Sequence, residues 1–172
     1  MIQLGLGAIH VRASALGEIE ERLQFAKQLG VDNIVVHTPE LPGDGYWDFK
    51  ALLLMRTLVE SYGLKLYAIE NLPRDFYDKI RHGLPGRDEQ VEKVCETIRN
   101  MGRARIPVLG YDWLLVGVWR TEYSPTGRGG ARVSKYDDEQ VKDAPLFELG
   151  EFDDETMWEN YTYFLKAVVP VA

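Results

Sequence analysis

Short apolar segments alternate with longer amphipathic segments four times along the chain. The apolar segments begin near residues 2, 33, 64 and 106. The run NIVVH (33–37) is typical of a strand that is buried on both faces. Between these runs, apolar residues recur three and four positions apart, which predicts helices. The predicted helices span 14–29, 48–61, 87–100 and 154–168. This alternation indicates βαβ units and a parallel sheet.

The predicted connections are of two kinds. Links from a helix to the next strand are short, as in GVD and GRAR, whereas links from a strand to the next helix are long. The long links span about 38–47, 71–86 and 113–153. A (β/α)8 barrel has this asymmetry because the loops after its strands build the active site. A doubly wound sheet shares it, so the asymmetry alone leaves both folds open.

Four βα units make half of an eight-unit barrel. A complete barrel takes about 250 residues, whereas this chain has 172. We therefore expect an α/β fold in which residues 1–172 are the amino-terminal half of one TIM-barrel domain, with no internal boundary. In this interpretation the closing VVPVA is the end of the fourth helix, and a fifth strand would follow it.

Composition narrows the classes of function. The net charge of −7 argues against a nucleic-acid partner and against an anionic membrane surface. No apolar run approaches the roughly 18 residues of a membrane-spanning helix, and the first residues do not resemble a secretory signal. The single cysteine, Cys95, excludes an internal disulfide. We expect a cytoplasmic protein.

Two polar residues stand where predicted strands end. His37 closes NIVVH, and Glu70 closes LKLYAIE (64–70). Side chains at such positions point into the mouth of a barrel, so both are candidate substrate-binding residues. A neutral imidazole binds a hydroxyl or relays a proton. The structural alternatives are a histidine that bonds only to backbone and a glutamate in an ion pair.

The fourth strand is followed by a segment rich in aromatic residues and arginine. Tyr111 and Trp113 could cover the apolar face of a sugar, and Arg120 could bind a carboxylate with its planar fork. All three are therefore candidates for binding an acidic sugar. Alternatively, WRTEY and ARVSKYD form a hairpin joined through GRGG, with no ligand. A single RGG in an acidic chain is weak support for RNA binding.

No histidine or cysteine has the spacing of a metal site. Cys95 falls on the apolar face of its helix and is expected to be buried. His82, in KIRHGLPGR, is expected in a solvated loop. The chain lacks HxxxH, HExxH and CxxC, so the sequence assigns no metal ligand.

Taken together, these stretches resemble the amino-terminal half of the mannonate dehydratase family, a xylose-isomerase-like TIM-barrel group. The matching segments are NIVVHTPELPGDGYW, GLKLYAIENLP, DEQVEKVCETIRNMGRARIPVLGYDW, WRTEYSPTGRGGARVSKYD and YFLKAVVPVA. The resemblance implies dehydration of D-mannonate to 2-keto-3-deoxy-D-gluconate in hexuronate catabolism, with Mn²⁺ or Fe²⁺. It also implies that the metal ligands and the acid–base residues belong to the second half of the barrel, so Cys95 is not a metal ligand.

The resemblance implies an incomplete enzyme. We expect the chain to be inactive alone, and either to self-associate through its open sheet edges or to lack a carboxyl-terminal half. Two alternatives remain open. One is a sugar isomerase or epimerase of the related barrel group, and the other is a non-catalytic binding module.

Overall fold

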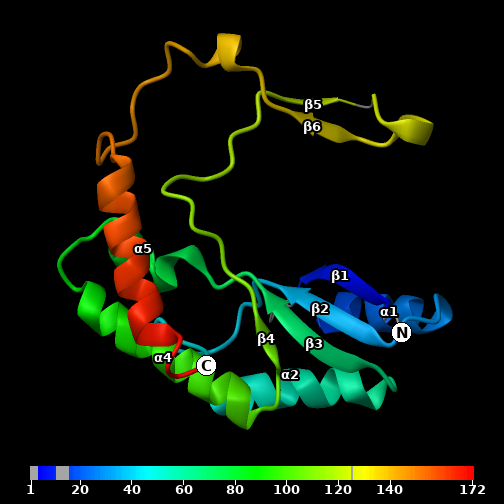
Figure 1. Cartoon of the computed structure of the whole chain (residues 1–172). Helices are drawn as coiled ribbons and strands as arrows, with labels where there is room; N and C mark the ends of the chain where they lie inside the picture. The colour runs from blue at the N-terminus through cyan, green and yellow to red at the C-terminus, as the bar shows by residue number, and fades with distance from the viewer. Residues whose placement is uncertain (1–3, 11–15, 125) are drawn as a thin grey trace.

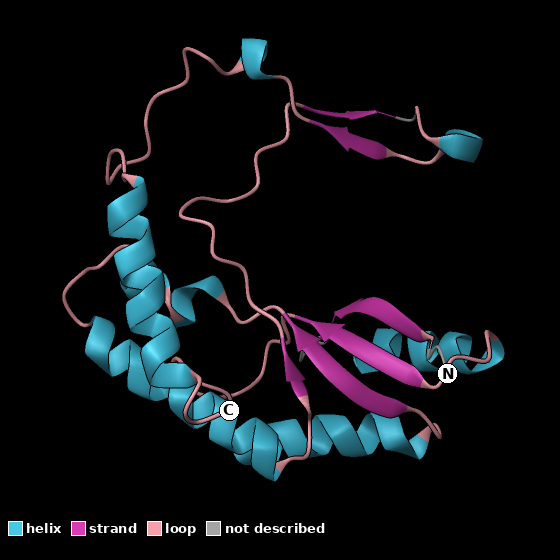
Figure 2. Cartoon of the chain, in the orientation of Figure 1, coloured by secondary structure: helices cyan, strands magenta, loops and turns pink. Residues whose placement is uncertain are grey.

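The computed structural model describes residues 4–10, 16–124 and 126–172. A parallel sheet of four strands, in the order β1-β2-β3-β4, forms its centre (Figures 1 and 2). The strands are β1 (Gly5–His10), β2 (Asn33–His37), β3 (Lys65–Glu70) and β4 (Val108–Leu109). The helices are α1 (Leu16–Gln28), α2 (Phe49–Ser61), α3 (Asp78–Arg81), α4 (Arg87–Arg103) and α5 (Asp154–Val168). No helix among the described residues is long and apolar enough to cross a membrane.

The strand order decides between the two folds that the sequence left open. In a doubly wound sheet the order reverses at a switch point and helices cover both faces. Here the strands follow one another in chain order, and parallel crossovers of one hand then place all the helices on the same face. This is the winding of a (β/α)8 barrel, with four of its units present.

A single apolar core joins the helices to the sheet. It includes Ile19 and Leu23 of α1, Leu52 of α2, Val94 of α4 and Phe164 of α5. The other face of the sheet is more open to solvent: Tyr67 lies between buried neighbours on β3 and is itself exposed. The two edge strands, β1 and β4, each pair with one strand among the described residues. The sheet is therefore open at both edges.

The predicted elements agree closely with the observed ones, with a few differences. The segment IQLGLG (2–7) predicts the first strand, whereas β1 continues to His10. Residues 2, 3, 14 and 15 of the predicted elements lie outside the described residues. The fourth strand is shorter than the predicted 106–112, because β4 bonds to β3 only through Val108 and Leu109. A short helix, α3, and a 3-10 turn, η1 (Arg74–Phe76), occupy the long link 71–86, for which no element was predicted.

Another difference is at the end of α4, which runs through Gly102 rather than stopping before it. The left-handed residue that ends the helix is Arg105, with φ of 55°. The amide of Ile106 donates to the Met101 carbonyl at 3.0 Å, and the amide of Arg105 donates to the Gly102 carbonyl at 2.9 Å. This pair of bonds is a Schellman motif, and it is stabilised because Ile106 is buried beyond it.

The hairpin that was one alternative for the long link 113–153 is confirmed. Strand β5 (Glu122–Ser124) pairs in antiparallel fashion with β6 (Val133–Lys135). The turn between them contains the 3-10 segment η2 (Arg128–Gly130), and a second one, η3 (Asp138–Gln140), follows β6. Figure 1 shows this hairpin projecting away from the parallel sheet.

A buried tryptophan fixes the loop between β2 and α2. Trp47 is fully buried, and its ring meets the Phe76 ring edge-on at 5.9 Å. Its amide donates to Thr97 Oγ1 at 3.2 Å, and its carbonyl accepts from Asn100 Nδ2 at 3.1 Å. Both partners are buried side chains of α4. Two long-range hydrogen bonds therefore hold this loop against the helix layer.

Replacement of Thr97 by valine tests this anchor. Valine keeps the shape of threonine but leaves the buried Trp47 amide without an acceptor, so the free energy of unfolding is expected to fall by about 1–3 kcal/mol. Urea denaturation followed by circular dichroism measures the change. The matched control is Thr162→Val on the exposed face of α5, where a change within about 0.5 kcal/mol is expected. Equal effects of the two substitutions would contradict the role of Thr97.

Candidate functional site

A pocket of about 540 Å³ opens at the carboxyl ends of β2, β3 and β4. All parallel strands end at the same edge of a sheet, so residues far apart in sequence meet there. The pocket is lined by His37, Thr38, Glu40, Asn71, Leu72, Arg74, Asp112 and Val118. Most of these side chains are polar, and they come from the segments that follow three different strands.

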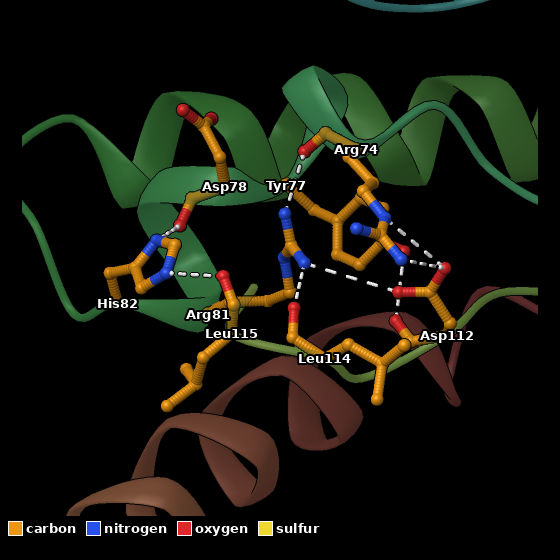
Figure 3. Close-up of polar contacts among 8 residues, drawn as sticks. All are labelled: Arg74, Tyr77, Asp78, Arg81, His82, Asp112, Leu114 and Leu115. Carbon is orange, nitrogen blue, oxygen red and sulfur yellow. Dashed lines mark hydrogen bonds and ion pairs between the residues drawn. The ribbon is translucent and has the colours of Figure 1, made fainter. Parts of the chain in front are cut away.

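The start of the long segment after β4 is fixed by side chains of α3 and of the residues that flank it (Figure 3). Tyr77 donates its hydroxyl to the carbonyl of Asp112 at 2.8 Å. Arg81 donates to the carbonyl of Leu114 and, at 3.4 Å, to that of Arg74. His82 Nε2 lies 3.0 Å from the carbonyl of Leu115. These contacts hold the backbone of 112–115 in place.

We call this set of contacts the α3 clamp; its side chains are Arg74, Tyr77, Arg81 and His82. His82 was predicted to be solvated, and this was wrong. Its ring is half-buried, lies 5.6 Å from the rings of both Phe147 and Phe152, and contacts the carbonyls of Asp78 and Leu115. The histidine therefore joins α3 to both ends of the long segment, a contact that its local sequence does not reveal.

The carboxylate of Asp112 lies close to two guanidinium groups, those of Arg74 and Arg81, beside the pocket. Asp112 Oδ2 accepts from Arg74 Nε at 3.4 Å and from Arg74 Nη2 at 3.2 Å. Its other oxygen, Oδ1, is buried without a hydrogen bond and lies 3.9 Å from Arg81 Nη1. The Arg81 side chain is almost fully buried, whereas that of Arg74 is 38% exposed. Asp112 therefore balances the buried charge and orients the exposed one.

Burial shifts the pKa values of two members of this cluster. Burial raises the pKa of Tyr77 from 10.0 to about 12, and the negative charge of Asp112 adds to the shift. Burial also lowers the pKa of Arg81, opposed by Tyr77 and Asp112. Both groups keep their protons at neutral pH, so the tyrosine remains a hydrogen-bond donor and the arginine a cation.

The first two candidate site residues lie at the pocket edge of the sheet. His37 lines the pocket. Glu70 is paired with His37 in the β2–β3 register and is exposed, but it is not among the lining residues. The geometry therefore brings the two strand ends together and places the imidazole in the pocket itself.

The two aromatic candidates point elsewhere. The Tyr111 ring meets the Phe164 ring edge-on at 5.2 Å, and the Tyr111 hydroxyl lies 3.1 Å from that of Tyr161. The Trp113 ring lies 4.9 Å from the Tyr161 ring. Both side chains thus pack against α5, and neither lines the polar pocket. Their described contacts attach the end of β4 to the last helix.

Arg120 lies in the exposed segment that leads to the hairpin. Its Nη1 donates to the neighbouring carbonyl of Trp119 at 2.9 Å, and the residue is not among those that line the polar pocket. The arginine that does line the pocket is Arg74, which sequence reasoning missed. Its position just after the predicted strand 64–70 was the available signal, since polar residues after strand ends face the mouth of a barrel.

The described residues do not form a metal site. Across residues 4–10, 16–124 and 126–172, no group of three or more His, Cys, Asp and Glu side chains could hold a metal ion. Cys95 is buried on α4, as expected from its helical face.

The family model for D-mannonate dehydratase (UxuA) matches residues 17–152. The chain belongs to this family. The curated mannonate dehydratase of Streptococcus pneumoniae (strain 70585) is 27% identical over 83% of this chain and 45% of that protein. The mannonate dehydratase of Thermotoga maritima is 29% identical over 83% of this chain and 48% of that protein. The chain thus spans about half the length of the curated relatives that it matches.

A solved structure in the mannonate dehydratase family shows the same fold. The crystal structure of mannonate dehydratase from Streptococcus suis serotype 2 superposes with a TM-score of 0.78 at 24% identity. The match covers 99% of this chain and 49% of that chain. This agrees with the strand order, and the predicted α/β fold of parallel βα units is confirmed.

Replacement of Arg81 by methionine tests the buried charge of the α3 clamp. Methionine preserves much of the apolar stem but leaves the Asp112 carboxylate and the Leu114 carbonyl without their buried partner, so a loss of about 3 kcal/mol in unfolding free energy is expected. Urea denaturation measures it. The matched control, Arg99→Met, removes a half-exposed arginine of α4 that pairs with Glu96, and a loss below about 1 kcal/mol is expected there. A loss for Arg81→Met no larger than that control would contradict the assignment.

Alkaline pH tests the buried tyrosine of the same clamp. Because the folded-state pKa of Tyr77 is raised, its contribution to stability is fully present below pH 10 and is lost as the pH rises from 10 towards about 12. Thermal unfolding across this range should show a smaller decline for Tyr77→Phe than for the wild type. The exposed hairpin variant Tyr123→Phe serves as the control and should follow the wild type. An unchanged profile for Tyr77→Phe would refute the shift.

Proposed function

We propose that this chain supplies the first half of a mannonate dehydratase barrel, and that the complete protein converts D-mannonate to 2-keto-3-deoxy-D-gluconate. The observation that carries the proposal is the family match over residues 17–152. The polar pocket at the carboxyl ends of the parallel strands supports it, because barrel enzymes carry their active sites at that face. The match also favours dehydration over isomerisation or epimerisation.

The reaction makes specific demands on the protein. A proton leaves the carbon next to the carboxylate, hydroxide leaves the neighbouring carbon and is released as water, and the resulting enol becomes the keto acid. The substrate must therefore be held by its carboxylate and its hydroxyls while a proton is moved. We assign the described residues the holding role, and we propose that the acid–base residues lie in the second half of the barrel.

The metal ion is part of the same proposal. A divalent ion, Mn²⁺ or Fe²⁺, is expected for the complete enzyme, and the described residues supply no ligand cluster for it. We propose that its ligands come from the second half of the barrel. The proposal also places the enzyme in hexuronate catabolism and in the cytoplasm. The single, buried Cys95 agrees with a reducing compartment.

Among the sequence candidates, we propose His37 and Glu70 as substrate-facing residues. His37 lines the pocket, and the register places Glu70 beside it at the end of β3. Tyr111 and Trp113 could reach the substrate only if α5 moved, because their rings pack on that helix. Arg120 could reach it only if the segment leading to the hairpin folded over the pocket. These three assignments therefore stand on the sequence alone.

We further propose that the second half of the barrel covers an apolar groove beside β4. This groove, of about 370 Å³, includes Val94 and Ile98 of α4, Leu109 of β4, and Phe164 and Val168 of α5. It lies next to the strand edge that pairs only with β3 among the described residues. A further parallel strand with its helix would pair with that edge and bury the groove. Without that partner, we expect the chain to self-associate through the same surface.

Turnover of D-mannonate tests the proposed function. The purified 172-residue chain, assayed with D-mannonate and Mn²⁺, should form no 2-keto-3-deoxy-D-gluconate, because the metal ligands are expected elsewhere. A chimera that joins the second half of the Thermotoga maritima relative after Ala172 should form it. Product analysis by mass spectrometry distinguishes dehydration, which lowers the mass by one water, from isomerisation, which leaves it unchanged.

Two controls sharpen this assay. The chimera stripped of metal with a chelator should lose activity and regain it on addition of Mn²⁺. Sedimentation velocity should show the isolated chain as a self-associated species and the chimera without that association. Turnover by the isolated chain, or a folded, metal-loaded chimera that leaves D-mannonate unchanged, would refute the proposal.

A further inference from the structure

We propose that Arg74, rather than Arg120, binds the carboxylate of the sugar acid; this inference rests on the proposed function. Among the described residues that line the polar pocket, Arg74 is the only lysine or arginine. A carboxylate that enters the pocket therefore meets one cationic side chain. The guanidinium fork is also the side chain best shaped to bind a carboxylate by two parallel hydrogen bonds.

The Arg74 side chain is held in one orientation by the protein. It follows β3 at the start of η1, and its Nε and Nη2 both bond to Asp112 Oδ2. Asp112 is in turn fixed by the Tyr77 hydroxyl on its carbonyl and by the buried Arg81 beside its carboxylate. A pre-oriented side chain loses little conformational entropy when a ligand binds, which favours affinity.

The contacts with Asp112 leave part of the guanidinium available. They use Nε and Nη2, whereas Nη1 lies beside Gly117, the residue before Val118, which lines the pocket. A Cβ atom at position 117 would lie 3.3 Å from Nη1. The absence of a side chain at Gly117 therefore preserves the space beside Nη1, and the side chain of Arg74 remains 38% exposed.

The rest of the lining suits hydroxyl groups and a single negative charge. His37, Thr38 and Asn71 bring an imidazole, a hydroxyl and a side-chain amide to the pocket. The backbone N–H of Asn71 donates to Thr38 Oγ1 at 3.3 Å. Glu40 and Asp112 add two carboxylates. These repel a second acid group, so the pocket fits a polyhydroxy monoacid better than a diacid or a phosphorylated sugar.

Arg120 neither lines the pocket nor is oriented by an ion pair with another described residue. It is exposed, its side chain bonds to the neighbouring Trp119 carbonyl, and it is not among the residues that line the pocket. A purely structural role for Arg74, as the ion-pair partner that holds Asp112 on η1, is the competing explanation. The two roles differ in one measurable respect, which is whether Arg74 distinguishes an acid from the matching neutral polyol.

Isothermal titration of the 172-residue chain with D-mannonate and with D-mannitol separates these roles. D-mannitol has the same hydroxyl pattern and a CH₂OH group in place of the carboxylate. The wild type should prefer D-mannonate by about 10- to 100-fold, the usual value of hydrogen bonds to a charged group. Arg74→Gln should remove most of that preference while leaving D-mannitol binding unchanged. The matched control Arg120→Gln should retain the preference.

A second variant keeps the test informative if Arg74→Gln fails to fold. Gly117→Ala leaves the Arg74–Asp112 ion pair in place and adds a methyl group 3.3 Å from Nη1, so it should weaken D-mannonate binding more than D-mannitol binding. Far-UV circular dichroism checks the fold of each variant. A folded Arg74→Gln that keeps the wild-type preference, or an Arg120→Gln that loses it, would overturn the inference and leave the proposed function intact. A wild-type chain without preference for the acid would overturn both this inference and the proposed substrate class of the pocket.

Discussion

The parallel pairing of β1 to β4 in chain order is the constraint on which the rest of this structure depends. Each strand must be followed by a crossover that returns to the opposite end of the sheet, and the right-handed preference of such crossovers places the helices on one face. The carboxyl ends of all the strands then lie at the same end of the sheet. The pocket, the α3 clamp and both open strand edges follow from this single geometry.

The buried Arg81 shows how the site edge is built from a helix of only four residues. Its guanidinium is removed from water and is balanced by Asp112, while it also holds carbonyls of Arg74 and Leu114. A charge in this position strongly disfavours arrangements in which its partners are displaced. The end of β4 is thereby fixed to the segment that follows β3. This connection lets Asp112 orient Arg74 in the pocket, although the parallel ladder itself extends only to Leu109.

We propose different partners for the polar pocket and for the apolar groove beside β4. The pocket at the carboxyl ends of the strands carries imidazole, hydroxyl, amide and guanidinium groups and is open to a small polar molecule. The groove beside β4 is lined almost entirely by apolar residues such as Ile98 and Leu109, which suits a protein segment. We propose a sugar acid for the pocket because the chain belongs to the mannonate dehydratase family. The chain spans about half of the relatives' length, which agrees with the proposal that the second half of the barrel covers the groove.

The sequence by itself determined the elements, because their signals are local. Apolar residues at helical spacing gave α2 and α5 to within a residue, and the β-branched run NIVVH is β2 itself. Membership of the mannonate dehydratase family was also evident from the order of short matching stretches. The position of His37 in the pocket follows from the general rule for strand ends in barrels.

Only the tertiary structure decided which polar side chains share a pocket. Arg74 and Asp112 are 38 residues apart and meet because they follow β3 and β4, which are neighbours in the sheet. Tyr111 and Trp113 turn towards α5, where their rings pack with Phe164 and Tyr161 in an aromatic layer. His82 looks like a loop residue until the long segment folds against it. Local patterns specify which side chains are buried, whereas their partners depend on long-range packing that one sequence does not display.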